Sequence, residues 1–200
     1  FMTELVEAAH SSGLRIFPSL RLQTANQEVP RDMAPGSFSE RHPEFHCRYK
    51  NGGCDDHLSL AFPEVRQFWI SLLCEALAYG FDGVHVIFCR SAPFVFYEEP
   101  VIQRFREAYG EDPRECPDDD PRLAQVHCTF VTEFARELKE AVTAMSTTLG
   151  KPLEIAYSVY TYIEGNLRWG IDLETLVREG LVDYLMPHPA FVNPQWHNAK

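Results

Sequence analysis

The residues best suited to chemistry in this sequence stand where expected strands end, or in the loops that follow them. Some are acids, and two carboxyl groups can serve as a general acid and a general base. The acidic candidates are Glu98, Glu99 and Glu164. Arginine, histidine and aromatic side chains in such places can hydrogen-bond or stack on a ligand. The candidates of this second kind are Arg21, His85, Arg90, Tyr97, Tyr160, Trp169 and His188.

Each candidate also has a structural interpretation, which the sequence alone leaves open. Glu98 and Glu99 can stabilise the start of a helix through its dipole, and Glu164 can be a solvated loop acid. His85 can be a core histidine with its hydrogen bonds satisfied. The two arginines can form salt bridges that order the strand ends, and the aromatic rings can pack the loops down.

Helix and strand patterns alternate along the chain. Apolar residues spaced by three and four predict helices, and short apolar or alternating runs bounded by glycine or proline predict strands. The expected helices cover 2–12, 63–79, 101–109, 121–149 and 173–179, and the expected strands cover 14–22, 81–90, 153–160 and 181–187. Residues 23–61 show no sustained periodicity. This alternation, with long connections, indicates parallel strands joined by right-handed crossovers.

Polar residues within the strands favour a barrel over an open doubly wound sheet. No glycine-rich phosphate loop follows a strand, which disfavours a nucleotide-binding sheet. An open sheet covered by helices on both faces needs apolar residues on both, whereas a barrel interior near its mouth can hold polar ones. The polar strand residues are Ser19, Arg21, His85, Glu154, Ser158 and His188.

We therefore expect the α/β class, with a (β/α)8 TIM-type barrel present as a partial barrel of about four β/α units. Residues 1–200 are expected to form a single domain, as a fragment of that barrel. A half barrel exposes two strand edges. These 200 residues alone are therefore expected to aggregate or pair.

Composition narrows the class of partner. The net charge of -11 argues against nucleic acid and against an anionic membrane surface. No run of about 18 apolar residues indicates a membrane span. Six cysteines are too few for a disulfide-built fold. Cys47 and Cys54 lie near His46 and His57, but no zinc-type spacing occurs there, so we expect neither a metal nor a cofactor.

Several motifs resemble the group of glycoside-hydrolase-like barrel proteins known as family-10-like or "glycosyl hydrolase-like". The stretch Asp82 to Arg90 (DGVHVIFCR) resembles a strand motif of that group. The flanking matches are HPE at 42–44, LAFPEVR at 60–66, YGEDPR at 109–114 and GIDLETLVREGLVD at 170–183. Together they span nearly the whole chain. The resemblance implies a barrel and a carbohydrate partner, a poly- or oligosaccharide.

One departure from the group concerns catalysis. Ile87 stands where the group usually has an acid that would point into the barrel mouth. Glycoside hydrolysis generally needs two carboxyl groups flanking the bond. The first hypothesis is therefore a glycoside hydrolase that uses other carboxylates, and the alternative is a non-catalytic carbohydrate-binding protein. A third hypothesis is a metal-dependent sugar isomerase or lyase, with Glu154, His188 and His85 as ligands.

Overall fold

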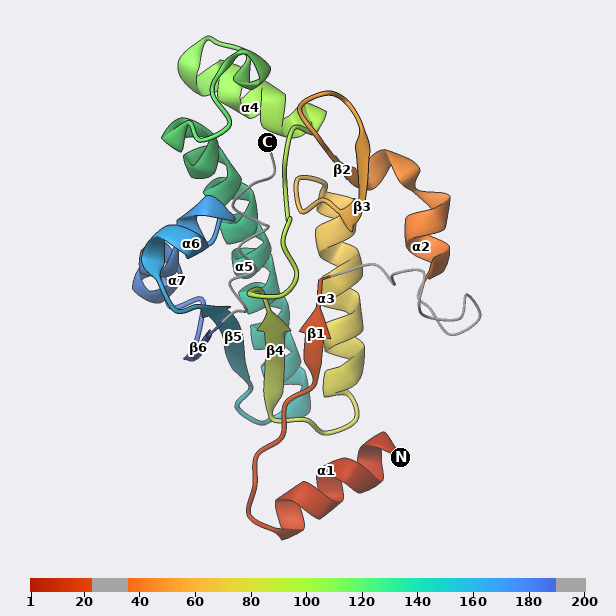
Figure 1. Ribbon diagram of the computed structural model, residues 1–200. Coiled ribbons are helices and arrows are strands. Elements are labelled where there is room, and N and C mark those ends of the chain that lie inside the picture. The colour runs from red at the N-terminus through yellow and green to blue at the C-terminus, as the bar shows by residue number, and fades with distance from the viewer. Residues whose placement is uncertain (23–35, 190–200) are drawn as a thin grey trace.

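A four-stranded parallel sheet forms the centre of the protein. The computed structural model describes residues 1–22 and 36–189. The strands are β1 (Ser19–Arg21), β4 (Gly83–Ile87), β5 (Glu154–Tyr160) and β6 (Tyr184–His188), in the order β1-β4-β5-β6 (Figure 1). Every pair in this sheet is parallel. The expectation of an α/β protein with parallel strands is confirmed.

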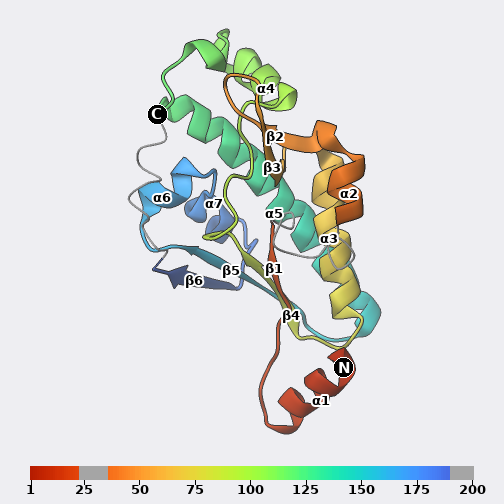
Figure 2. The same cartoon turned by 45° about the vertical axis from the view of Figure 1, so that its right-hand side comes forward.

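The connections between the strands are helical, as the alternation predicted. The helix α1 (Met2–Ser11) precedes the sheet, and α3 (Pro63–Leu77) leads into β4. The helices α4 (Glu99–Tyr109) and α5 (Pro121–Leu149) connect β4 to β5, and α6 (Ile163–Arg168) and α7 (Leu173–Arg178) connect β5 to β6. In Figures 1 and 2, α3 and α5 lie on the same side of the sheet. In the described ranges, every helix is too short or too polar to cross a membrane.

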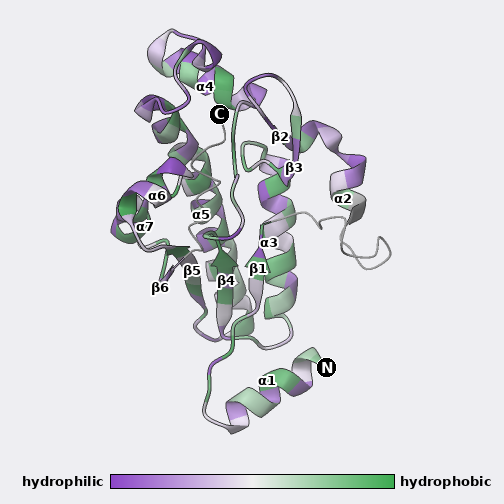
Figure 3. Cartoon of the chain, in the orientation of Figure 1, coloured by the Kyte–Doolittle hydropathy of each residue, from purple (hydrophilic) through white to green (hydrophobic). Residues whose placement is uncertain are grey.

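One face of the sheet supplies the hydrophobic core. Alternate strand residues, among them Val84, Val86, Ile155 and Tyr157, are fully buried. They belong to one apolar cluster with side chains of α3 and α5, among them Val65, Trp69, Phe130, Phe134 and Leu138. Figure 3 shows hydrophobic residues along β4 and a mostly hydrophilic stretch between α4 and α5. Burial of this apolar surface holds the two long helices against the sheet.

The opposite face of the sheet is polar, and no described helix covers it. His85 hydrogen-bonds Ser19 Oγ through Nδ1 at 2.7 Å and Ser158 Oγ through Nε2 at 2.8 Å. At the amino end of the strands, Glu154 accepts a hydrogen bond from Tyr184 at 2.8 Å and pairs with Arg15.

Two elements at the start of the chain differ from the expectation. The strand expected over 14–22 is regular only over Ser19–Arg21, because Pro18 lacks the N–H that a regular ladder needs, although its carbonyl accepts from the N–H of His85. Residues 43–58 are not structureless either. The short helices α2 (Gly36–Arg41) and η1 (Pro43–Phe45) are followed by an antiparallel hairpin of β2 (His46–Arg48) and β3 (Cys54–Leu58). The helix α6 was not expected either.

Both ends of α5 and the start of α7 lie where they were expected, and each has a cap. The side chain of Asp120 accepts from the backbone N–H of Arg122 at the start of α5. Asp172 caps α7 in the same way, through the N–H of Thr175. Gly150 ends α5 with a φ of 65°, a left-handed conformation that favours glycine. These local signals depend on neighbours in sequence, which is why the sequence revealed them.

Candidate functional site

Four of the candidate binding residues lie at the carboxyl ends of the four strands, an edge of the sheet called here the mouth. Arg21 ends β1, Tyr160 ends β5 and His188 ends β6, while Arg90 follows β4 by three residues. Arg21 lies beside Ile87 in the strand register, and Tyr160 lies beside His188. The parallel sheet therefore brings side chains that are distant in sequence to one edge.

The two arginines at the mouth are in direct contact. Nη2 of Arg21 donates a hydrogen bond to the carbonyl oxygen of Arg90 at 2.9 Å. Both side chains are exposed. Within the described ranges the Arg90 guanidinium makes no hydrogen bond or ion pair, and because the side chain is exposed its N–H donors are accessible to a ligand. Ile87 supplies no carboxylate between them.

His85 lies deeper than the arginines, on the polar face of the sheet. Burial lowers the pKa of His85, which favours the neutral ring. A neutral imidazole has one donor and one acceptor nitrogen. The hydroxyl groups of Ser19 and Ser158, on either side of the ring, satisfy both ring nitrogens. His85 therefore has a structural role on this face of the sheet.

Tyr160 and His188 form the other side of the mouth. Burial raises the pKa of Tyr160 to about 12, so its phenol stays protonated at neutral pH. The sequence analysis missed Asn166, which is buried. Its Oδ1 accepts a hydrogen bond from the backbone N–H of Tyr160, and its Nδ2 donates one to the carbonyl of Tyr160. Nδ1 of His188 is buried and has no hydrogen-bond partner among the described residues.

The three candidate carboxylates occupy different environments. Glu98 has no exposed surface. Its Oε1 accepts from the N–H of Arg48 at 2.7 Å, and its Oε2 accepts from the N–H of Phe96 at 2.9 Å. Burial raises the pKa of Glu98, while these backbone hydrogen bonds oppose the rise. The carboxyl group therefore joins the end of β2 to the segment before α4, and its burial argues against contact with a substrate.

Glu99 and Glu164 are exposed, in the first turns of α4 and α6. These positions match the structural interpretation, in which the helix dipole favours an acid. They also leave both carboxylates accessible to solvent, on helices that come after β4 and β5. No hydrogen bond among the described residues joins any two of the three acids, and their catalytic roles stay predictions.

Tyr97 and Trp169 are half-buried in the loops above the mouth. The backbone N–H of Tyr97 donates to the carbonyl of Arg48 at 3.0 Å. Burial raises the pKa of Tyr97 to about 12. Trp169 follows α6 directly and contacts the ring of Phe96. Both residues therefore help to pack the loops, as their structural interpretation required.

The hairpin carries a polar cluster that the sequence analysis missed. Asp55 accepts hydrogen bonds from the Tyr49 hydroxyl and from Nδ1 and the backbone N–H of His57. Burial opposes ionisation of Asp55, but these hydrogen bonds lower its pKa overall. The hydrogen bond to Asp55 raises the pKa of Tyr49 to about 12. Asp55 and His57 are two residues apart, which places them on the same face of a strand. This spacing could have indicated the cluster, but residues 23–61 were taken as irregular.

The donor set of a metal-dependent enzyme is not assembled in the described ranges. No group of three or more His, Cys, Asp or Glu side chains there could hold a metal ion. Glu154 begins β5 whereas His188 ends β6, so the two lie at opposite ends of the sheet. In the hairpin, Cys47 is buried and Cys54 is exposed.

Comparison with known proteins gives little further information. No family model matches the chain, and no curated protein matches it. Among solved structures, an alpha-galactosidase from Thermus thermophilus in complex with stachyose matches at 15% identity and a TM-score of 0.48, over 94% of this chain and 31% of that one. The same enzyme with p-nitrophenyl alpha-D-galactopyranoside matches at 18% identity and a TM-score of 0.35, over 98% of this chain and 47% of that one.

This chain therefore spans less than half the length of either alpha-galactosidase structure. At TM-scores below 0.5, neither similarity bears on the function of this chain. Both structures are described as alpha-galactosidases and not as members of the family-10-like group that the sequence resembles.

We predict that Glu98→Ala destabilises the fold. The substitution leaves the N–H groups of Arg48 and Phe96 without an acceptor, and each buried, unpaired group costs about 1–3 kcal/mol. The free energy of unfolding, measured by urea denaturation, should fall by at least about 2 kcal/mol. Glu99→Ala is the matched control and should cost no more than about 1 kcal/mol. Equal unfolding midpoints for the two variants would contradict the assignment.

We also predict a pH-dependent contribution from His127. Its Nε2 donates to the carbonyl of Phe96 at 3.0 Å, and burial lowers its pKa to about 4. The unfolded ring titrates near pH 6.5, so below that pH the unfolded state binds more protons. The stability is fully present above about pH 6.5 and is lost progressively as the pH falls toward 4, by about 3 kcal/mol.

His127→Gln retains an N–H donor for Phe96 but does not titrate. The unfolding free energy of the wild type should therefore fall more steeply than that of the variant between pH 7 and pH 4. The measurement is urea denaturation of both proteins across this range. Parallel curves for the two proteins would show that His127 does not contribute.

Proposed function

We propose that this chain is part of a glycoside-hydrolase-like (β/α) barrel and that carbohydrate binds at its mouth. The observation that carries the proposal is the polar face of the sheet. Ser19, His85 and Ser158 are hydrogen-bonded across three strands, on the face that no described helix covers. Polar side chains near the mouth are compatible with a barrel interior. The four strands amount to about half of an eightfold barrel.

The chemistry of the mouth supports a polyhydroxylated ligand. Arg90 offers open N–H donors, and Tyr160 offers a protonated phenol beside an apolar ring. Active sites of such barrels lie at the carboxyl ends of the strands. The resemblance of residues 82–90 to glycoside-hydrolase-like proteins agrees with this placement. The barrel, the family-10-like relationship and the ligand class are all parts of the proposal.

The activity that we propose is hydrolysis of a poly- or oligosaccharide. It requires two carboxyl groups on either side of the glycosidic bond, about 5–5.5 Å apart for retention of configuration and about 6.5–9.5 Å for inversion. Of the three predicted acids, Glu99 and Glu164 are accessible and follow strands that end at the mouth. They are the catalytic candidates of this chain, whereas the buried Glu98 is a poor one.

Ile87 favours a second candidate function, non-catalytic carbohydrate binding. In the register this residue lies between Arg21 and Ser158, on the polar face of the sheet. An acid at position 87 would stand beside the arginine and near the bound ligand. The isoleucine supplies no such carboxyl group, whereas Arg21 and Arg90 remain as hydrogen-bond donors at the mouth.

We predict that Arg90→Ala weakens carbohydrate binding. Removing a charged hydrogen-bond donor costs about 1.5–3 kcal/mol, so affinity in the full-length protein should fall at least about tenfold. The measurement is titration calorimetry with cello-, xylo-, malto- and galacto-oligosaccharides. Arg178→Ala is the control, because this exposed arginine lies on α7 and pairs with Glu174. If the Arg90→Ala variant bound these sugars with unchanged affinity, the proposal that carbohydrate binds at the mouth would be contradicted.

We predict that Glu99→Gln and Glu164→Gln each lower kcat for release of reducing ends from the same sugars. Loss of a general acid or base costs about 10²–10⁴ in rate. Glu107→Gln is the control on α4, and its kcat should not change. Hydrolysis that persists in both variants would contradict these catalytic assignments. Binding without any hydrolysis by the wild type would instead support the non-catalytic function.

A further inference from the structure

Three aromatic rings from three separate loops form a row. Tyr49 belongs to the turn between β2 and β3, Phe96 to the segment between β4 and α4, and Trp169 to the turn between α6 and α7. The ring centroids of Tyr49 and Phe96 lie 5.5 Å apart, and those of Phe96 and Trp169 lie 6.4 Å apart. The rings are tilted by 37° and 48°, so they are not stacked face to face.

This aromatic row lies at the end of the molecule where the mouth is. The hairpin lies in the connection after β1, Phe96 in the connection after β4 and Trp169 in the connection after β5, and Figure 1 shows the hairpin and α6 beyond the tips of the strand arrows. Tyr49 is 44% exposed, and the other two rings are half-buried. The row therefore offers aromatic surface to solvent on the carboxyl side of the sheet.

Buried polar side chains fix the middle of the row. The backbone N–H of Phe96 donates to Glu98, and its carbonyl accepts from His127. The same Glu98 carboxyl group receives the N–H of Arg48, the residue before Tyr49. Two neighbouring rings are thus placed by one carboxyl group that has no exposed surface.

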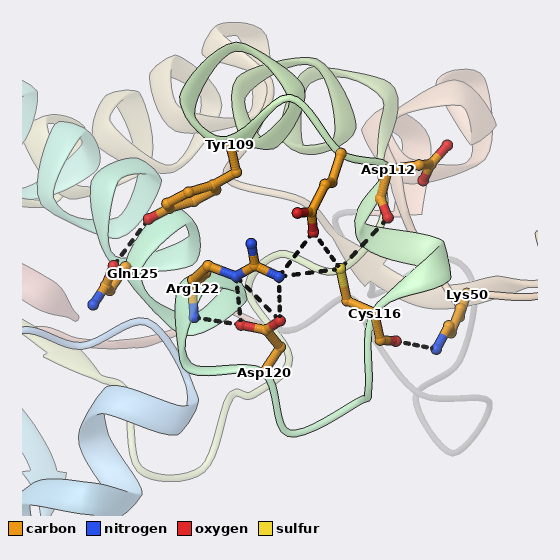
Figure 4. A network of polar contacts seen from close by, with 8 residues as sticks. Lys50, Tyr109, Asp112, Cys116, Asp120, Arg122 and Gln125 are labelled. Carbon is orange, nitrogen blue, oxygen red and sulfur yellow. Dashed lines mark hydrogen bonds and ion pairs between the residues drawn. The ribbon is translucent and has the colours of Figure 1, made fainter.

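The two ends of the row are fixed as well. Next to Tyr49, Nζ of Lys50 donates to the carbonyl of Cys116 at 2.7 Å and pairs with Asp118 at 2.9 Å. Figure 4 shows this lysine joined to Cys116 at the edge of a network that includes Arg122 and Asp120. At the other end, Gly170 follows Trp169, and a Cβ at this glycine would lie within 3.1 Å of His127 atoms. Only glycine permits so close an approach to α5.

Holding these loops has an energetic cost. A carboxyl group and an imidazole ring lose hydration when they are buried, and protein interiors accept such groups only when they are hydrogen-bonded. Here Glu98 and His127 hydrogen-bond backbone groups of the segments that carry Tyr49 and Phe96. Preorganised aromatic faces bind ligands with little loss of conformational entropy.

We propose that Tyr49, Phe96 and Trp169 form an extended subsite on which successive sugar residues of an oligosaccharide stack. This inference deepens the proposed function and rests on it. The arginines at the mouth contact one end of the chain, and the aromatic row contacts the sugar residues beyond it. Affinity should therefore increase with the length of the oligosaccharide.

The test compares short and long sugars on the full-length protein. The probes are cello-, xylo-, malto- and galacto-oligosaccharides of one to six residues, measured by titration calorimetry. In the series that binds, Tyr49→Ala and Trp169→Ala should each lower the affinity of the longest member about tenfold and leave that of the shortest member unchanged. The control is Tyr79→Ala, because this tyrosine is also 44% exposed but lies between α3 and β4, at the amino end of the strands.

A second measurement, fluorine NMR, observes Trp169 without removing an aromatic side chain from the row. Protein labelled with 5-fluorotryptophan should show a shift of the Trp169 fluorine resonance with long sugars and not with the monosaccharide, the resonance being assigned with Trp169→Phe. Binding that does not depend on length, or on either substitution, would overturn the aromatic subsite alone. Absence of binding in all four series would overturn the proposed function together with it.

Discussion

The alternation of side chains along β4 and β5 decides what each face of the sheet can contact. Val84, Val86 and Tyr157 point to the face that α3 and α5 cover, where burial of apolar surface stabilises the fold. His85 and Ser158 point to the other face and hydrogen-bond each other. A helix packed on this face would exclude the water that polar groups need when they have no protein partner. The helices therefore gather on one side, and the strand ends stay accessible to a ligand.

The loops at the mouth are organised by buried polar side chains more than by apolar packing. Glu98 joins backbone groups of two loops, Asn166 fixes the end of β5, and His127 holds Phe96 from α5. A loop has no regular ladder to satisfy its own backbone groups, so side chains must do so. These contacts give the loops defined positions, which a site for an oriented ligand requires.

The sequence predicted the features that depend on near neighbours. The helices expected from residues 121 and 173 begin at those residues, and the polar residues expected along the strands include the hydrogen-bonded set Ser19, His85 and Ser158. The hairpin and the role of Glu98 could not be predicted in this way. Glu98 looks like an ordinary acid before a helix, and only the fold brings Arg48, fifty residues away in sequence, within hydrogen-bond distance. The proposed sugar contacts also depend on loop positions that no local pattern encodes.

The most direct test of the central claim, that the polar face of the sheet lines a barrel, is an experimental structure of the full-length protein that contains these residues. The account predicts that β1 and β6 each pair with a further parallel strand, and that no helix contacts Ser19, His85 or Ser158. A helix packed on these three residues would contradict it, because the sheet would then be open and doubly covered, and the mouth would lose its place as the entrance to a barrel.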